Sequence, residues 1–152
     1  MMIDFVEFDQ TILNHSWEWL NNPEIKKLTN TPDFTRAQQQ QWFDSLPAKK
    51  AAYFIKGVCV DGIPIGVTGL KNKTVTEGEY WGYIGDKSYW GKGIGKKMLA
   101  YILEQGRQEG LEKIYLKVIA SNQRAVALYE GRGFVVVQDA STATELHMEY
   151  VY

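Results

Sequence analysis

The chain has 152 residues, 45% of them hydrophobic, which suits one folded domain spanning residues 1–152 with a substantial core. Its 17 lysines and arginines nearly balance its 18 aspartates and glutamates, and the resulting net charge of -1 argues against a nucleic-acid partner. The single Cys59 excludes an internal disulfide framework, and His15 and His147 have no third ligand nearby, so we expect no metal site.

The first segment, MMIDFVEFDQ, contains early acids and aromatics and lacks the basic and apolar regions of a secretory signal. No apolar run approaches the length of a membrane span. We therefore expect a cytoplasmic protein without a membrane partner. Within this segment, residues 2–8 mostly alternate apolar and polar side chains, which predicts a first strand.

Two helices are predicted next. Apolar residues recur at helical spacing over Thr11–Asn21, and Pro23 follows as a stop signal. Thr35 and Gln38 then form the T-x-x-Q pattern of a capping box, which begins a second helix that Pro47 ends.

A group of strands follows. Tyr53–Val60 and Ile63–Leu70 are rich in β-branched and aromatic residues, and Asp61-Gly62 between them is the dipeptide favoured in a two-residue type I′ turn. These segments predict a hairpin, which a third strand near Glu79–Gly85 extends into an antiparallel meander.

The remaining elements are a helix over Gly93–Gln108, a strand over Ile114–Val118, a short helix over Asn122–Glu130, and a closing hairpin of Phe134–Val137 with Glu145–Tyr152. The chain is therefore predicted to be α/β (α+β), with a mixed, mostly antiparallel sheet of about six to seven strands flanked by about four helices.

Three alternating glycines, Gly91, Gly93 and Gly95, follow a predicted strand and open a helix. Such a loop allows a ligand to approach the backbone closely, and the first helical turn offers unpaired N–H groups to an anion. A Walker loop is excluded because Trp90 stands where glycine is required and Lys97 where serine or threonine is required. The G-x-G-x-x-G dinucleotide pattern is absent too, so the alternatives are another anion site or a loop with a structural role only.

A second motif about 30 residues later, N-Q-R-A-V-A-L-Y-E-G-R-G-F over residues 122–134, accompanies this loop. Together the two motifs resemble those of the GNAT superfamily of N-acyltransferases, and the resemblance covers residues 63–134. It implies acetyl-CoA as cosubstrate, with its pyrophosphate held by Gly91, Lys92, Gly93, Ile94, Gly95 and Lys96. One departure is Trp90, where the commonest form of the motif has arginine or glutamine.

The resemblance also implies the catalytic groups. Tyr129 matches the family's acid, which protonates the departing thiolate; the alternative is an aromatic side chain that packs against Ala125 and Leu128. Glu79 is the best candidate for the base, because many members place a carboxylate on the strand before the cradle. Glu77 is the reserve, and a solvated charge at a strand end is the alternative role of Glu79.

Further cofactor contacts are implied beside the cradle. The backbone of Tyr83, Ile84 and Gly85 is expected to run along the pantetheine arm. Asn122 either caps its helix or also bonds near the pantetheine. Arg124 and Lys96 are candidates for the 3′-phosphate of CoA, or are solvated surface residues.

The acceptor is the least defined part of the prediction. The aromatic residues of the two early helices either form core or line the acceptor cleft: Trp17, Trp19, Trp42 and Phe43. A branch of the family that acts on protein N-termini carries a carboxylate five residues before the helix asparagine, and Lys117 stands there. We therefore expect a small-molecule amine, for which an amino sugar is one candidate. Protein or peptide N-acetylation and a catalytically silent acyl-CoA-binding module remain the alternatives, and homodimerisation is left open.

Overall fold

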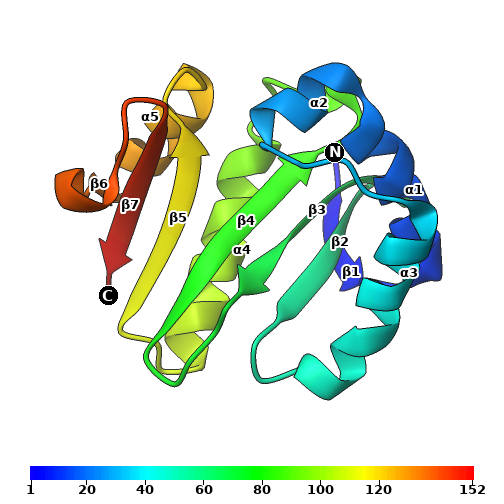
Figure 1. Cartoon of the computed structure of the whole chain (residues 1–152), viewed down its shortest axis with the longest axis horizontal. Coiled ribbons are helices and arrows are strands. Elements are labelled where there is room, and N and C mark those ends of the chain that lie inside the picture. Colours follow the sequence, from blue (N-terminus) through cyan, green and yellow to red (C-terminus); the bar gives the residue numbers. More distant parts are fainter.

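Seven strands form one mixed sheet in the computed structural model, which describes residues 1–152 (Figure 1). The strands are β1 (Ile3–Glu7), β2 (Phe54–Val60), β3 (Ile63–Lys71), β4 (Glu77–Ile84), β5 (Lys113–Ile119), β6 (Val135–Val136) and β7 (Glu145–Val151), in the sheet order β1-β2-β3-β4-β5-β7-β6. Only β4 and β5 are parallel; every other neighbouring pair is antiparallel. The predicted fold class is confirmed.

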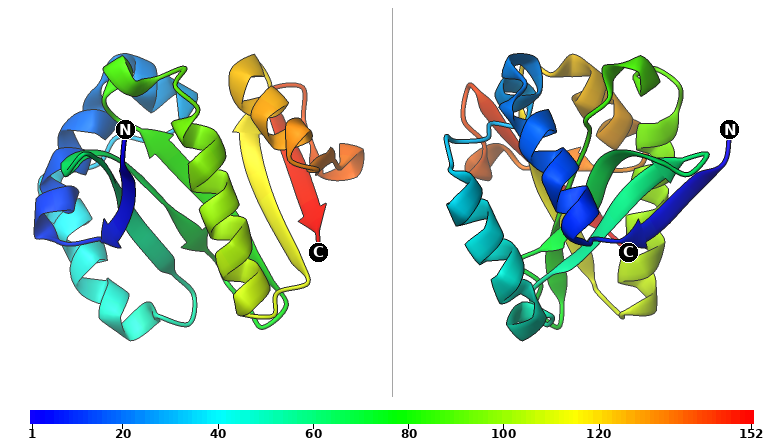
Figure 2. Two further views of the ribbon diagram at one scale, coloured as in Figure 1. Left: turned by 180° about the vertical axis from the view of Figure 1, so that it is seen from behind. Right: turned by 90° about the vertical axis from the view of Figure 1, so that its right-hand side faces the viewer.

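Five α-helices cover the two faces of this sheet: α1 (Gln10–Asn21), α2 (Pro23–Leu28), α3 (Arg36–Ser45), α4 (Ile94–Gln108) and α5 (Gln123–Gly131). Figures 1 and 2 show α1, α2 and α3 on one face, over the amino-terminal half of the sheet, and α4 and α5 on the other. On the face that carries α1, α2 and α3, no helix covers β5 and β7 (Figure 1). None of the helices combines the length and apolar character that crossing a membrane requires.

Local signals explain where most elements begin. Asp9 caps α1 by accepting a hydrogen bond from the Ile12 N–H at 3.0 Å. The predicted capping box at the start of α3 is present, with both reciprocal bonds formed. Asp61 and Gly62 both have positive φ, 50° and 82°, which is the backbone of the predicted type I′ turn between β2 and β3.

The prediction missed α2. Pro23 is predicted to stop the preceding helix, but it occupies the first position of α2, where a missing N–H costs no hydrogen bond. Asn22 caps this helix through its side-chain oxygen, which accepts from the N–H groups of Glu24 and Ile25. The number of helices is therefore five rather than about four, and α2 supplies part of the wall of the cleft described below.

The core lies mainly between the sheet and α4. Its larger cluster joins Leu99, Ile102 and Leu103 of α4 to Ile114 and Leu116 of β5, all almost completely buried. Side chains of α5 pack against the same cluster. This packing fixes the start of α4 beside the end of β4, where the glycine loop connects them.

Candidate functional site

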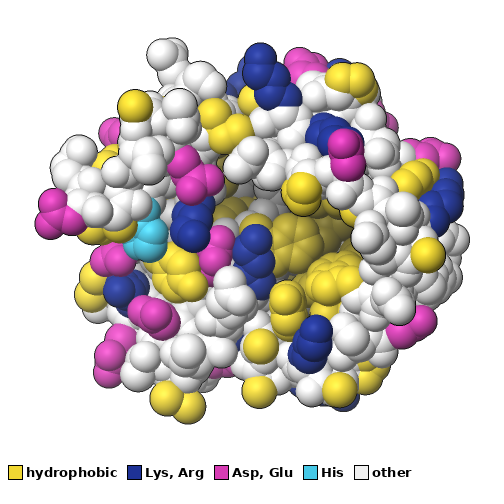
Figure 3. Space-filling view, viewed as in Figure 1, with side chains coloured by type: hydrophobic (Ala, Val, Ile, Leu, Met, Phe, Trp, Pro, Cys, Tyr) yellow, Lys and Arg dark blue, Asp and Glu magenta, His cyan; other side chains and the backbone are white.

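A cleft of about 830 Å³ opens where β4 and β5 separate. These parallel strands pair only from Glu77–Lys113 to Glu79–Tyr115, and beyond that point they diverge. Residues from both faces of the sheet line the cleft, so it runs through the gap between the two strands. Figure 3 shows its mouth on the α1–α2 face as a hollow with an apolar floor and charged side chains at its border.

Most of the predicted site residues meet in this cleft: Glu79, Tyr83, Ile84, Gly91, Gly93, Ile94, Gly95, Lys96, Asn122, Arg124 and Tyr129. Gly85 and Lys92 do not line it. The Gly85 N–H donates to the Ile65 carbonyl at 2.7 Å, and the indole of Trp19 covers its Cα. The Lys92 ammonium turns away, to 5.9 Å from the ring centre of Tyr89.

The glycine loop has the backbone that an anion cradle needs. Gly91 and Gly93 have φ of 74° and 79°, in the left-handed region where side chains with a Cβ are strained. Gly93 is the N-cap of α4 and provides no side-chain oxygen, so the first N–H groups of this 15-residue helix are not capped by it. They are available to an anion at the positive end of the helix dipole.

Trp90 fastens this loop to the end of β4. Its indole N–H donates to the Ile84 carbonyl at 2.9 Å, in a partly buried position. Since the Gly85 N–H points to β3, strand alternation turns the backbone groups of Gly82 and Ile84 toward the gap left by β5. Trp90 takes the Ile84 carbonyl, so the departure from the commonest motif has a structural role.

Replacing Trp90 with phenylalanine keeps most of the ring but leaves the Ile84 carbonyl without its donor. We expect the free energy of unfolding to fall by about 1–3 kcal/mol, the cost of one unsatisfied, partly buried acceptor. Chemical denaturation of Trp90→Phe beside Trp42→Phe, whose indole N–H makes no hydrogen bond, measures this difference. Equal losses in the two variants would mean that ring size alone matters.

Tyr129 lies on α5 and faces the cleft. Its ring packs edge-on against Tyr80 of β4, with centroids 6.0 Å apart, and its hydroxyl makes no hydrogen bond within the chain. Burial, followed by the neighbouring Tyr80, raises the pKa of Tyr129 far above that of an ordinary phenol. The phenol therefore stays protonated at neutral pH and can act as a proton donor but not as a base.

Asn122 and Arg124 stand at the amino-terminal end of the same helix. The Asn122 side-chain oxygen accepts from the Ala125 N–H at 3.3 Å, which is the predicted capping role. Both residues also line the cleft. This placement is compatible with contact to a bound cofactor in addition to capping.

Glu79 is buried in the middle of the site, with 8% of its surface exposed. Its carboxylate accepts a hydrogen bond from the Asn72 amide at 3.0 Å and lies 3.9 Å from the Lys71 ammonium. A solvated strand-end charge is therefore a wrong description of this residue. Asn72 adopts a left-handed backbone, φ 51°, at the end of β3, and this brings its amide to Glu79.

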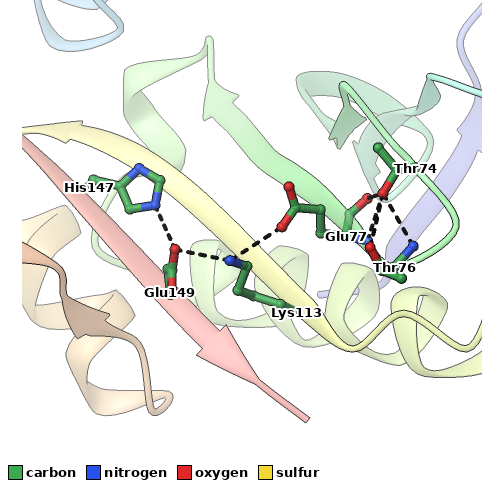
Figure 4. Close-up of polar contacts among 6 residues, drawn as sticks. All are labelled: Thr74, Thr76, Glu77, Lys113, His147 and Glu149. Carbon is green, nitrogen blue, oxygen red and sulfur yellow. Dashed lines mark hydrogen bonds and ion pairs between the residues drawn. The ribbon is translucent and has the colours of Figure 1, made fainter. Parts of the chain in front are cut away.

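Glu77, the reserve base, lies outside the cleft lining. Figure 4 shows its carboxylate directed to Lys113, 3.3 Å away, which also contacts Glu149 at 3.2 Å. His147 completes this row through a 2.9 Å contact with Glu149. Glu77 is thus part of a surface ion-pair row, which leaves Glu79 as the buried carboxylate of the cleft; Glu145 of β7 also lines it but is only partly buried.

The four aromatic residues of the early helices do not line the cleft. Trp42 and Phe43 pack edge-on against Phe8, and Trp17 packs against Phe34, but these side chains are only partly buried and belong to neither core cluster. The wall comes instead from the end of α1 and from α2 with the loop after it: Leu20, Ile25, Leu28, Thr29, Asn30 and Thr31. These residues were not predicted at the site because α2 was not predicted; Pro23, which begins that helix, was the available signal.

Several groups that perform covalent or metal chemistry elsewhere are absent from the cleft. It contains no cysteine, serine or histidine side chain, and Cys59 is buried in β2. No three His, Cys, Asp or Glu side chains are grouped as metal ligands. What the cleft does combine is an anion cradle, a protonated phenol and a buried carboxylate.

Comparison with known proteins identifies relatives of this chain. Residues 13–134 match the sequence model of the Acetyltransferase (GNAT) family. N-alpha-acetyltransferase 30 of Saccharomyces cerevisiae is 34% identical over 77 residues, 48% of this chain and 44% of that protein. Mycothiol acetyltransferase of Propionibacterium freudenreichii is 29% identical over 140 residues, 86% of this chain and 41% of that protein. The chain thus spans less than half the length of these relatives.

The fold has a close structural counterpart as well. The spermidine N-acetyltransferase of Vibrio cholerae, solved in complex with CoA and spermine, superposes with a TM-score of 0.86 at 19% identity and covers 98% of this chain and 95% of that one. Identity this low supports likeness of fold alone, whereas the family match extends over most of the sequence. The chain therefore belongs to the GNAT family of acetyltransferases.

Proposed function

We propose that this protein transfers an acetyl group from acetyl-CoA to a primary amine, by direct attack within a ternary complex. The observation that carries the proposal is the cleft between β4 and β5. The glycine cradle and Tyr129 line it on the α4–α5 face of the sheet, and Glu79 lines it on the α1–α2 face. A thioester threaded through this gap meets an amine that enters from the α1–α2 side. The absence of a cysteine, serine or histidine nucleophile from the lining favours direct transfer.

The residues have complementary roles in this reaction. Glu79 takes a proton from the incoming ammonium group, and the free amine nitrogen attacks the thioester carbonyl carbon. The tetrahedral oxyanion collapses and breaks the carbon–sulfur bond, and Tyr129 donates its phenolic proton to the departing thiolate. The attacking nitrogen releases its second proton to solvent, from which Tyr129 regains a proton. Backbone N–H groups that face the gap, at Gly82 and Ile84, are the donors nearest to the developing oxyanion. The products are CoA and the N-acetylated amine.

The chemistry is tested by a screen of primary amines for thiol release from acetyl-CoA. We expect release that depends on the amine and matches the N-acetylated product in amount. Acetyl-CoA binding without release for any amine would instead support the silent acyl-CoA-binding module. The acyl chain length of the donor is varied in the same screen.

A small-molecule amine is the favoured acceptor because Lys117 lines the cleft where a branch acting on protein N-termini has a carboxylate. The peptide alternative has its own support, since N-alpha-acetyltransferase 30 is among the relatives. Peptides that begin with different residues therefore belong in the screen. Acetylation of peptides in preference to every small amine would reverse this assignment.

Replacing Glu79 with glutamine keeps the side-chain shape and an oxygen for Asn72 but removes the base. We expect turnover to fall by about 10²-fold or more at low pH, where the amine arrives protonated, and by less as pH rises. Steady-state rates across pH measure this, with Glu77→Gln as the matched control on the same face of β4. An equal loss at every pH would transfer the role to another group.

A further inference from the structure

The mouth of the cleft on the α1–α2 face carries two ammonium groups. Lys71 lies on β3 and Lys117 on β5, and both line the cleft on either side of β4, which holds Glu79. Leu116 and Val118, the neighbours of Lys117, point into the core beneath α4, so the Lys117 side chain projects from the opposite face. An acceptor whose amine reaches Glu79 therefore passes between two cations.

Lys117 differs from the other lysine on the same face of β5. The Lys113 ammonium is held by Glu77 and Glu149 at 3.3 and 3.2 Å, contacts that raise the pKa of Lys113 (Figure 4). Lys117 forms no salt bridge and no side-chain hydrogen bond, although it borders the cleft. The sheet thus neutralises Lys113, whereas Lys117 has no salt-bridge partner. Glu145, which pairs with Ile119 across β5 and β7, also lines the cleft but forms no salt bridge.

Two more hydrogen-bond donors on the α1–α2 face have unused N–H groups. The Lys71 ammonium has only a 3.9 Å contact with Glu79, whose close hydrogen-bond partner is Asn72, and 41% of the Lys71 side chain is exposed. Trp81 shares the face of β4 that carries Glu79, and its indole N–H is buried without any hydrogen-bond partner. An oxygen-rich ligand is what such unused donors recognise.

Resting on the acetyl transfer proposed above, we propose that the acceptor amine carries a phosphate group, which Lys117 and Lys71 bind at the mouth of the cleft. A lysine ammonium binds phosphate as a compact point charge, and two such charges match the roughly two negative charges of a phosphate monoester better than the single charge of a carboxylate. On the opposite wall, the side-chain amide of Asn30 makes no hydrogen bond and is offered to the uncharged part of the acceptor, whereas the hydroxyls of Thr29 and Thr31 bond to each other at 2.6 Å. A polyamine is disfavoured, because its extra positive charges meet two cations.

The proposal is tested by binding, with the protein saturated with CoA so that the cradle is filled. Two matched pairs of probes are titrated by calorimetry: ethanolamine with O-phosphoethanolamine, and glucosamine with glucosamine 6-phosphate. We expect the phosphorylated member of at least one pair to bind about tenfold or more tightly than its partner, a difference of about 1.4 kcal/mol. Equal affinity within both pairs, or no binding of any probe, overturns the proposal.

The same titrations of lysine variants then test whether Lys117 binds the phosphate group. Lys117→Gln is expected to remove the preference for the phosphorylated probe, whereas Lys117→Arg keeps it. Lys97→Gln, which removes an exposed lysine of α4 outside the cleft, is expected to behave as wild type. A preference that survives in Lys117→Gln contradicts the proposal.

Failure of this proposal and failure of the proposed function give different results. The titration requires no acetyl transfer, so phosphate-dependent binding without turnover would retain the phosphate site and remove the enzymatic activity. Acetylation of neutral or polycationic amines in preference to phosphorylated ones would retain the activity and overturn the phosphate site.

Discussion

Tyr129→Phe is expected to lower kcat by about 10²- to 10⁴-fold while acetyl-CoA affinity and stability change little. The ring that packs against Tyr80 and Phe134 is kept, and only the hydroxyl is lost. Since that hydroxyl makes no hydrogen bond in the fold, its removal leaves no partner unsatisfied. The rate loss corresponds to about 3–5 kcal/mol of transition-state stabilisation.

Single-turnover acetyl transfer and a binding titration, run side by side, measure the two quantities separately. Tyr101→Phe is the matched control, because Tyr101 is a partly buried tyrosine of α4 outside the cleft. A rate loss in Tyr129→Phe below about threefold, under 1 kcal/mol, would mean that Tyr129 only packs and that the proton comes from elsewhere.

Gly93→Val is expected to weaken acetyl-CoA binding by about 10²-fold or more, a loss near 3 kcal/mol, in a chain that still folds. The position has φ 79°, where a β-branched residue is strained, and no other atom lies within 4 Å of a Cβ placed there. The new side chain therefore has room in the free protein but stands in the cradle that the pyrophosphate needs.

Gly110→Val provides the matched control for Gly93→Val. Gly110 follows the opposite end of α4 with φ 76°, and it too has open space around its Cβ position. Backbone strain is thus similar in the two variants, while only Gly93 belongs to the cleft. Calorimetric titration that finds the same acetyl-CoA affinity for both would remove the cradle from the account.

Much of the fold could be predicted because its signals are local. The Asp61-Gly62 turn and the Thr35–Gln38 capping box depend on a few adjacent residues, and both are present. The start of α4 at the glycine loop follows from equally local features. Pro23 led to a wrong prediction because proline is compatible with either the end of one helix or the first turn of the next.

The site was predictable where it is continuous in sequence and not where it depends on contacts between strands. The cradle and the α5 motif are single segments, and most of their predicted residues line the cleft. Glu79 contacts Lys71 and Asn72 because β3 and β4 pair in one particular register, with Lys71 opposite Glu79. No local residue pattern specifies that register. Likewise, Gly85 was expected beside the cofactor, but its N–H is taken up by β3.

The most direct test of the account is product analysis after a single turnover of acetyl-CoA with an accepted amine. Direct transfer in a ternary complex predicts equal amounts of free CoA and N-acetylated amine, with no acetyl group left on the protein at any time. CoA formed without acetylated amine, or an acetyl group bound covalently to the protein before the amine is added, would contradict it.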